Sequence, residues 1–187
     1  MKYLIAGLGN IGDEYSGTRH NIGFSVLDAL AGASSAVFRH DRHAFVTEIK
    51  HKGRILVLIK PTTYMNLSGK AIQYWMQAEK IAQENVLVVT DDIALPFGTI
   101  RIKGKGSDGG HNGLKHIQAT LNSVEYARLR FGVGSEFSKG RQVDYVLGKW
   151  NADEQKLLPE RLEKCCEAIK AFTTIGIGLT MTNFNGK

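Results

Sequence analysis

Strand-like and helix-like segments alternate along this chain, and this alternation limits the possible folds more than any other feature. The strand-like segments are short, largely apolar runs at Tyr3–Gly7, Ala44–Lys50, Arg54–Lys60, Asn85–Thr90, Thr99–Lys103 and Ala127–Gly132. The second and third of them are rich in β-branched residues. The helix-like segments repeat apolar residues every three or four positions, at Asn21–Ala31, Ser68–Gln77, Asn112–Leu121 and Ala152–Ile175. Such alternation predicts an α/β fold with a sheet flanked by helices.

Length and cysteine usage predict one domain in the cytoplasm. A chain of 187 residues has the size of a single domain, and we expect residues 1–187 to form one. No apolar run approaches the roughly 20 residues that span a bilayer, and the run before Gly7 is too short for a secretory signal. Cys165 and Cys166 are neighbours in a helical pattern, which favours free thiols and a reducing compartment.

The positive charge is concentrated in one part of the sequence. The chain carries a net charge of +6, and residues 101–150 hold nine Lys or Arg against four acids. A basic bias of this kind is compatible with an anionic partner such as nucleic acid. A solvated charged surface would explain it equally well, so charge alone leaves both interpretations open.

A glycine-rich motif near the N-terminus suggests a nucleotide site, but its surroundings argue against one. Residues 7–12 fit the pattern Gly-x-Gly-x-x-Gly after a strand, which in dinucleotide-binding folds opens a helix beneath a pyrophosphate. Here the next six residues are typical of a loop and include Asp13 and Glu14, which would repel a phosphate. We interpret the glycines as shaping a tight loop that directs Asn10 into a cleft.

Four polar clusters fall where strands end, which is where α/β folds usually build their sites. They are Asn10 with Tyr15 and residues 18–21, then residues 60–69, 90–96 and 104–113. His20 in the first cluster has the side chain of a natural general base, which a carboxylate can orient. No serine lies in a nucleophile-elbow pattern and no cysteine lies near the clusters, which favours an activated water as the nucleophile. The six histidines show no metal-binding spacing, so we predict no metal site.

These clusters are similar, in order and spacing, to the motifs of bacterial peptidyl-tRNA hydrolases. The matching blocks cover nearly the whole chain, and they are residues 7–24 (including Thr-Arg-His-Asn), 60–71 (Lys-Pro-x-Thr-Tyr-Met-Asn), 91–98 (Asp-Asp-x-x-Leu-Pro), 109–115 (Gly-Gly-His-Asn-Gly), 128–134 (Arg-Leu-Arg-x-Gly-Val-Gly) and 145–148 (Tyr-Val-Leu-Gly). The resemblance implies a single α/β domain around a twisted mixed sheet, monomeric, with neither cofactor nor metal. It also implies hydrolysis of the ester that joins a peptide to the 3′-terminal ribose of tRNA.

The resemblance also implies a role for each matching residue. His20 would activate water, Asp91 would orient His20, and Asn10 would help to distinguish N-blocked peptidyl groups. The residues implied to bind the peptide, the ribose and the tRNA 3′ end are Asn66, Asn112, Tyr15, Tyr64 and Met65. Lys103 and Arg130 match a basic pair that would hold a tRNA phosphate.

Two positions depart from the family pattern. Ile11 stands where proline is usual, so we expect a less rigid Asn10 loop, because the fixed φ of proline is lost. Ala94 stands where an acid is frequent, although Asp91 is kept. A non-catalytic RNA-binding module and a nucleotide-dependent enzyme remain as alternatives that ester turnover and nucleotide titration would separate.

Overall fold

A mixed sheet of seven strands forms the centre of the computed structural model, which describes residues 1–186. The strands lie in the order β2-β3-β4-β1-β5-β7-β6. Their bounds are β1 Lys2–Gly7, β2 Arg39–Asp41, β3 Ala44–His51, β4 Arg54–Pro61, β5 Val86–Asp92, β6 Ile100–Lys103 and β7 Ala127–Gly132. The central strands β4, β1, β5 and β7 are parallel, and β3 and β6 pair antiparallel at their two sides. The α/β class and the mixed sheet predicted from the sequence are confirmed.

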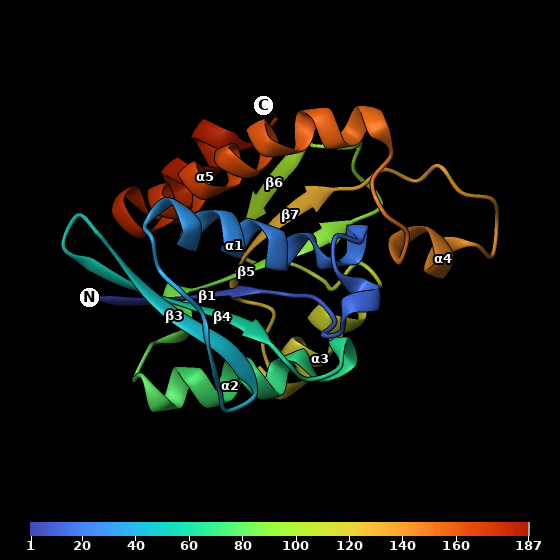
Figure 1. Cartoon of the computed structure of the whole chain (residues 1–187). Coiled ribbons are helices and arrows are strands. Elements are labelled where there is room, and N and C mark those ends of the chain that lie inside the picture. Colours follow the sequence, from blue (N-terminus) through green and yellow to red (C-terminus); the bar gives the residue numbers. More distant parts are fainter. Residues whose placement is uncertain (187) are drawn as a thin grey trace.

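Helices cover both faces of this sheet. Their bounds are α1 Ile22–Ala33, α2 Ser68–Ala78, α3 Asn112–Leu121, α4 Gln142–Val146 and α5 Ala152–Phe184, with short 3-10 turns η1 Asp13–Tyr15, η2 Arg19–Asn21, η3 Met65–Leu67 and η4 Gln83–Asn85. Helices α1 and α5 lie on one face and α2 and α3 on the other, while α4 stands away from the sheet at one end (Figure 1). Every helix of residues 1–186 is too short or too polar to cross a membrane.

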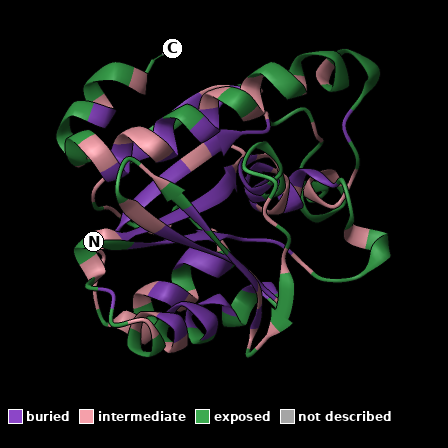
Figure 2. Ribbon diagram, turned by 60° about the vertical axis from the view of Figure 1, so that its left-hand side comes forward, coloured by how far each residue is buried: buried purple, intermediate pink, exposed green. Residues whose placement is uncertain are grey.

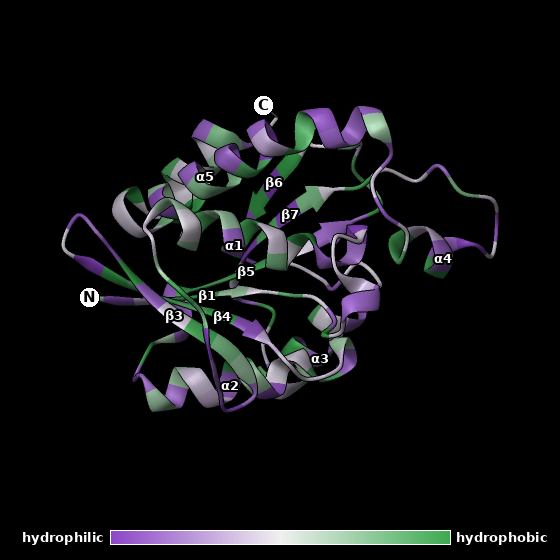
Figure 3. Ribbon diagram, viewed as in Figure 1, coloured by the Kyte–Doolittle hydropathy of each residue, from purple (hydrophilic) through white to green (hydrophobic). Residues whose placement is uncertain are grey.

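The sheet separates two apolar cores. Alternate side chains of one strand point to opposite faces, so that in β1 the buried Ile5 packs toward α1 and α5, and Leu4 packs toward α2 and α3. Buried residues accordingly follow the strands and the inner sides of the helices (Figure 2). The same segments are the apolar ones in Figure 3. The predicted helical periodicity is therefore the pattern of contact with the sheet.

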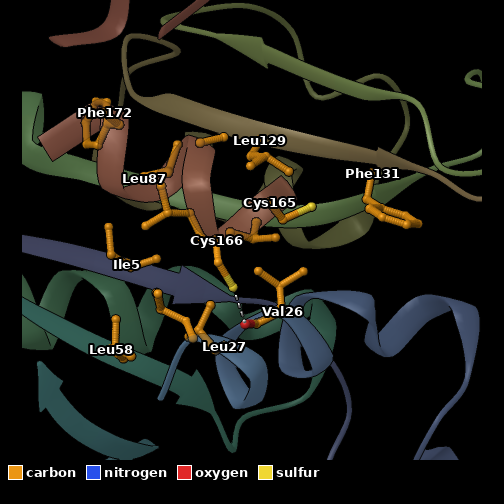
Figure 4. Close-up of a cluster of buried hydrophobic side chains, with 14 of the residues drawn as sticks. Ile5, Val26, Leu27, Leu58, Leu87, Leu129, Phe131, Cys165, Cys166 and Phe172 are labelled. Atoms are coloured by element: carbon orange, nitrogen blue, oxygen red, sulfur yellow. Dashed lines mark hydrogen bonds between the residues drawn. The ribbon is translucent and has the colours of Figure 1, made fainter. Parts of the chain in front are cut away.

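Both cysteines lie in α5 and belong to the apolar core that α1 and α5 form with the sheet. Cys165 and Cys166 are free thiols, and Figure 4 shows them among Leu27, Leu129 and other apolar side chains. The Cys166 thiol makes a weak hydrogen bond to the carbonyl of Val26 at 3.9 Å. Burial raises the pKa of the Cys166 thiol to about 11. Both groups therefore behave as small apolar side chains rather than as nucleophiles.

The sequence predicted most element bounds to within two residues, but it missed three features. The missed features are β2, α4 and the last part of α5. Helix α5 was expected to end at Ile175, and Gly176 does leave the helical conformation with φ 83° and ψ 172°. The chain then resumes helical turns as far as Phe184. This last part is too short to show a helical repeat of apolar residues in the sequence.

One glycine sets the position of the segment that carries His20. A Cβ atom on Gly23, in the first turn of α1, would lie under 3.0 Å from backbone atoms of Leu8 and Val89. Glycine alone lets α1 approach β1 and β5 this closely. The turn η2, which directly precedes α1, is thereby held at the carboxyl ends of the parallel strands, where α/β folds place their sites.

Candidate active site

A cavity of about 760 Å³ opens at the carboxyl ends of the parallel strands. The structure brings most of the sequence-predicted site residues to its lining. Those that line it are Asn10, His20, Tyr64, Met65, Asn66, Asp91, Asn112 and Arg130. Tyr15 and Lys103 are outside the lining. Residues from six separate segments therefore meet at one place.

His20 and Asp91 form a hydrogen-bonded pair in the wall of this cavity. The distance from His20 Nδ1 to Asp91 Oδ2 is 2.8 Å. Asp91 is 5% exposed at the end of β5, whereas the side chain of His20 retains 16% exposure. Because a carboxylate only accepts, Nδ1 of His20 donates, and Nε2 is left with the lone pair. This is the tautomer that a general base needs.

A second histidine, His111, contacts the other oxygen of Asp91. The distance from His111 Nε2 to Asp91 Oδ1 is 2.8 Å. Nδ1 of His111 accepts from the backbone N–H groups of Gly113 and Leu114, so that His111 caps the N-terminus of α3. Since Nδ1 accepts, Nε2 carries the ring proton and donates it toward Asp91 and the hydroxyl of Thr90, which lies at 2.6 Å. Sequence analysis placed His111 in a polar cluster but gave it no role.

These contacts shift the pKa values of both members of the pair. Burial tends to lower the pKa of His20, but the hydrogen bond and the charge of Asp91 outweigh it, and the net shift is upward from 6.5. Burial tends to raise the pKa of the Asp91 carboxyl. The electrostatic attraction of the two imidazoles and the hydrogen bonds that they donate outweigh that effect and hold this pKa well below its usual range. Asp91 is thus an anion whenever His20 titrates.

Asn10 is fixed by Asn21, which the sequence analysis placed in the first polar cluster without giving it a role. The Asn21 carboxamide accepts from the Asn10 backbone N–H at 2.8 Å and donates to the Asn10 carbonyl at 2.8 Å. The side-chain oxygen of Asn10 in turn accepts from the Met65 backbone N–H at 3.3 Å. Asn21 is 3% exposed. These three bonds restrain the backbone and the side chain of Asn10, in the loop where Ile11 stands in place of the usual proline.

Two carboxamides and an aromatic ring extend the site along η3 and α3. Asn66 lies in η3, and Asn112 is the first residue of α3. Tyr64 exposes 78% of its surface beside the cavity, and Met65 is buried beneath it. The arrangement offers neutral donors and acceptors on either side of the His20–Asp91 pair, and one flat apolar surface at the rim.

The two basic residues predicted to bind phosphate are in different surroundings. Arg130 lines the cavity and forms an ion pair with Asp92 at 2.8 Å. Lys103 is exposed at the end of β6, outside the lining. Tyr15 lies in η1, where its carbonyl accepts from the hydroxyl of Thr18 at 2.8 Å. The roles of Lys103 and Tyr15 in substrate binding stay predictions.

The pair and its neighbour also resemble a possible metal site, which their protons disfavour. One potential ligand atom each from His20, Asp91 and His111 lies within 4.8 Å of the other two. The two ring nitrogens that face Asp91 both carry the proton that they donate to its carboxylate. A metal could bind these nitrogens only after they had lost those protons. The geometry therefore fits a hydrogen-bonded chain better than a metal centre.

Comparison with known proteins points to one family. The family model described as peptidyl-tRNA hydrolase matches residues 4–187. The peptidyl-tRNA hydrolase of Cytophaga hutchinsonii is 62% identical over 187 residues, and that of Phocaeicola vulgatus is 59% identical, each with 100% of both chains covered. The crystal structure of peptidyl-tRNA hydrolase from Acinetobacter baumannii matches with a TM-score of 0.91 at 34% identity, over 98% of this chain and 94% of that one.

Proposed function

This chain belongs to the peptidyl-tRNA hydrolase family, as its motifs predict, and from that premise we propose that it hydrolyses the ester between a peptide and the 3′-terminal ribose of tRNA. The observation that carries the proposal is the 2.8 Å contact between His20 Nδ1 and Asp91, in a cavity lined by carboxamides. The products are a peptide with a free carboxylate and a tRNA with a free 3′-hydroxyl group.

In the proposed mechanism, His20 acts as a general base on water. Its Nε2 removes a proton as the water oxygen attacks the ester carbonyl carbon, and Asp91 stabilises the imidazolium that forms. The same proton then passes to the departing ribose oxygen, which completes the hydrolysis. An aminoacyl ester is already activated, so positioning by one base and a polar cradle suffices without a covalent intermediate.

Carboxamides supply the polar cradle. Asn10, Asn66 and Asn112 line the cavity around the base, and their N–H groups can donate to a peptide backbone or to the oxygen that gains negative charge. Carboxamides do not titrate, so they serve at any pH at which His20 is neutral. A cradle of this kind recognises groups that all peptidyl-tRNAs share.

The tRNA side of the substrate would contact aromatic and basic residues. Tyr64 offers an exposed ring on which a base of the 3′ end can stack. Arg130 keeps its orientation through Asp92, and with Lys103 it would contact phosphate. Because phosphate contacts release counterions, binding should weaken as salt is raised. Translation supplies this substrate in the cytoplasm, and we expect the protein to act there as a monomer.

His20→Ala tests the proposal directly. We expect release of peptide from peptidyl-tRNA to fall about 10²–10⁴-fold, the usual contribution of a general base, while circular dichroism shows an intact fold. His40→Ala is the matched control, because His40 is exposed on the edge strand β2. Equal activity in both variants would contradict the assignment. Tight tRNA binding by the wild-type protein without any ester turnover would instead favour the RNA-binding module.

A further inference from the structure

One wall of the cavity is formed by α4 and is apolar. Val143, Val146 and Leu147 line the cavity and together form what we call the apolar wall. They lie three and four positions apart, on one side of the short helix. No residue of α4 is buried. Figure 1 shows the helix and the preceding loop projecting from the body of the molecule. Within α4 the half-buried Tyr145 packs against the edge of the apolar core, and its hydroxyl donates to the carbonyl of Val133 at 2.6 Å. The three residues of the wall are not held by burial of their own.

The end of α4 is attached in addition to the segment that carries His20. The backbone N–H of Arg19 donates to the carbonyl of Gly148 at 3.0 Å. Thr18 and Lys149 form an isolated antiparallel bridge beside it. The Arg19 side chain adds a bond from Nη1 to the carbonyl of Tyr145 at 3.1 Å. Two distant parts of the sequence are thus joined one residue before the general base.

The Arg19 guanidinium is the centre of this junction. It lies 4.2 Å from the centroid of the Tyr145 ring and 5.7 Å from that of Trp150. Its Nη2 forms an ion pair with Glu154 Oε1 at 3.1 Å. Glu154 also accepts from the backbone N–H of Asn151 and so completes the capping box of α5. One side chain therefore connects η2, α4 and the start of α5.

Arg19 cannot act as a surface cation for tRNA. Arg19 is 8% exposed, and both of its terminal nitrogens are bonded within the protein. Its side chain does not belong to the cavity lining, so contact with the reacting atoms is also excluded. What remains is an indirect role, exerted through the residues that it holds.

We propose that Arg19 is a positioning residue for substrate specificity, because it fixes the apolar wall at a set distance from His20. The inference rests on the proposed function and deepens it. In the bound substrate, the side chain of the peptide's C-terminal residue lies next to the ester and packs on this wall. Bulky apolar side chains gain contact area there, and glycine gains none. Loss of the Arg19 contacts releases the wall. It therefore weakens the binding of substrates that end in a bulky apolar residue more than the binding of those that end in glycine.

Arg19→Lys tests the proposal with two substrates, N-acetyl-leucyl-tRNA and N-acetyl-glycyl-tRNA. Lysine keeps the charge but loses the planar fork and the ring stacking. We expect KM for the leucyl substrate to rise roughly 5- to 20-fold relative to the glycyl one, close to the roughly 10-fold that one methylene is worth in a weakly discriminating apolar pocket. The pH midpoint of kcat should not move, because the His20–Asp91 pair is untouched.

Two further variants separate positioning from general damage. Asn151→Ala removes the cap of α5 but leaves Arg19 and Glu154 in place, and it should keep the wild-type ratio of the two KM values. Glu154→Gln keeps an acceptor for the cap but loses the charge that pairs with Arg19, and it should change the ratio in the same direction as Arg19→Lys, by less.

Hydrogen exchange gives a readout that does not depend on turnover. Amides of residues 145–148 should exchange faster in Arg19→Lys and at the wild-type rate in Asn151→Ala. Equal effects of Arg19→Lys on both substrates, or unchanged exchange at these amides, would overturn the inference. If the wild-type protein hydrolyses neither substrate, the proposed function itself fails, which is a different result.

Discussion

The two sides of the cavity are held in place in different ways. On one side, His111 and Asn112 stand at the start of α3, whose Gly113, Leu114 and Ile117 are buried in the core. On the other side, α4 buries none of its residues and is joined to the body through Tyr145 and through its end. The groups that would act on the ester bond lie on elements fixed by core packing. The apolar wall lies on an element that a few polar and ring contacts hold.

This difference matches what the two sides would have to recognise. The ester, the ribose and the peptide backbone are the same in every peptidyl-tRNA, so the groups that meet them gain from rigid placement. The side chain of the last amino acid varies, and the wall that meets it has to offer only an apolar surface at a set distance from the ester. Few buried contacts and an exposed backbone also mark α4 as a segment of low local stability.

The largest effect is expected from Asp91→Asn, which changes a group on an element that core packing holds in place. Asparagine has nearly the same shape, but it lacks the charge that stabilises the His20 imidazolium, and its N–H₂ group would face a donor on one of the two histidines. We expect kcat to fall about 10²–10⁴-fold, as when the orienting carboxylate of a catalytic triad is replaced. Asp28→Asn, which alters an exposed carboxylate paired with Lys60, should leave kcat unchanged. A loss of less than tenfold in Asp91→Asn would show that the pair is not central.

The pH profile sharpens the same prediction. The base works only when neutral, so kcat should rise with pH, and because Asp91 raises the pKa of His20 the midpoint should lie above 6.5. In Asp91→Asn the negative charge that raises the pKa of His20 is lost, while burial still disfavours the charged imidazole. The midpoint should therefore move down, and the variant should keep a larger share of its own maximal rate in acid. An upward shift would contradict the assignment.

Packing on the rigid side is tested by Gly113→Ala. A Cβ at this position would lie 2.8 Å from Leu8 Cδ1 and 2.8 Å from Met65 Sδ. Replacing glycine by alanine in a helix normally stabilises it by up to about 1 kcal/mol. Here we expect a net loss of about 1–3 kcal/mol in the free energy of unfolding, because the core is overpacked. Urea denaturation measures this free energy. An unchanged or increased stability would show that the residues packed around the start of α3 can move to accommodate the added methyl group.

Sequence reasoning predicted the side of the cavity formed by α3 and the strand ends far better than the side formed by α4. Long apolar patterns such as that of α3 report contact with a sheet, and motif residues such as His20 and Asp91 stand at strand ends. The roles of His111, Asn21 and Arg19 were not found, because each acts through contacts between residues far apart in the chain. Helix α4 has five residues and no buried one, so it leaves no periodic pattern to detect. Tyr15 was predicted to line the cleft and lies outside the cavity lining.

The smallest effect is expected from Val143→Ala, on the apolar wall. Val143 is 66% exposed, so its truncation should change the free energy of unfolding by no more than about 0.5 kcal/mol. KM for N-acetyl-leucyl-tRNA should nevertheless rise about 2- to 5-fold, since two methyl groups leave the wall at up to ~0.8 kcal/mol each when fully covered. Val37→Ala removes an even more exposed valine far along the chain and should change neither quantity. A destabilisation of Val143→Ala like that expected for Gly113→Ala would mean that α4 is packed as firmly as α3, and the contrast between the two sides would then disappear.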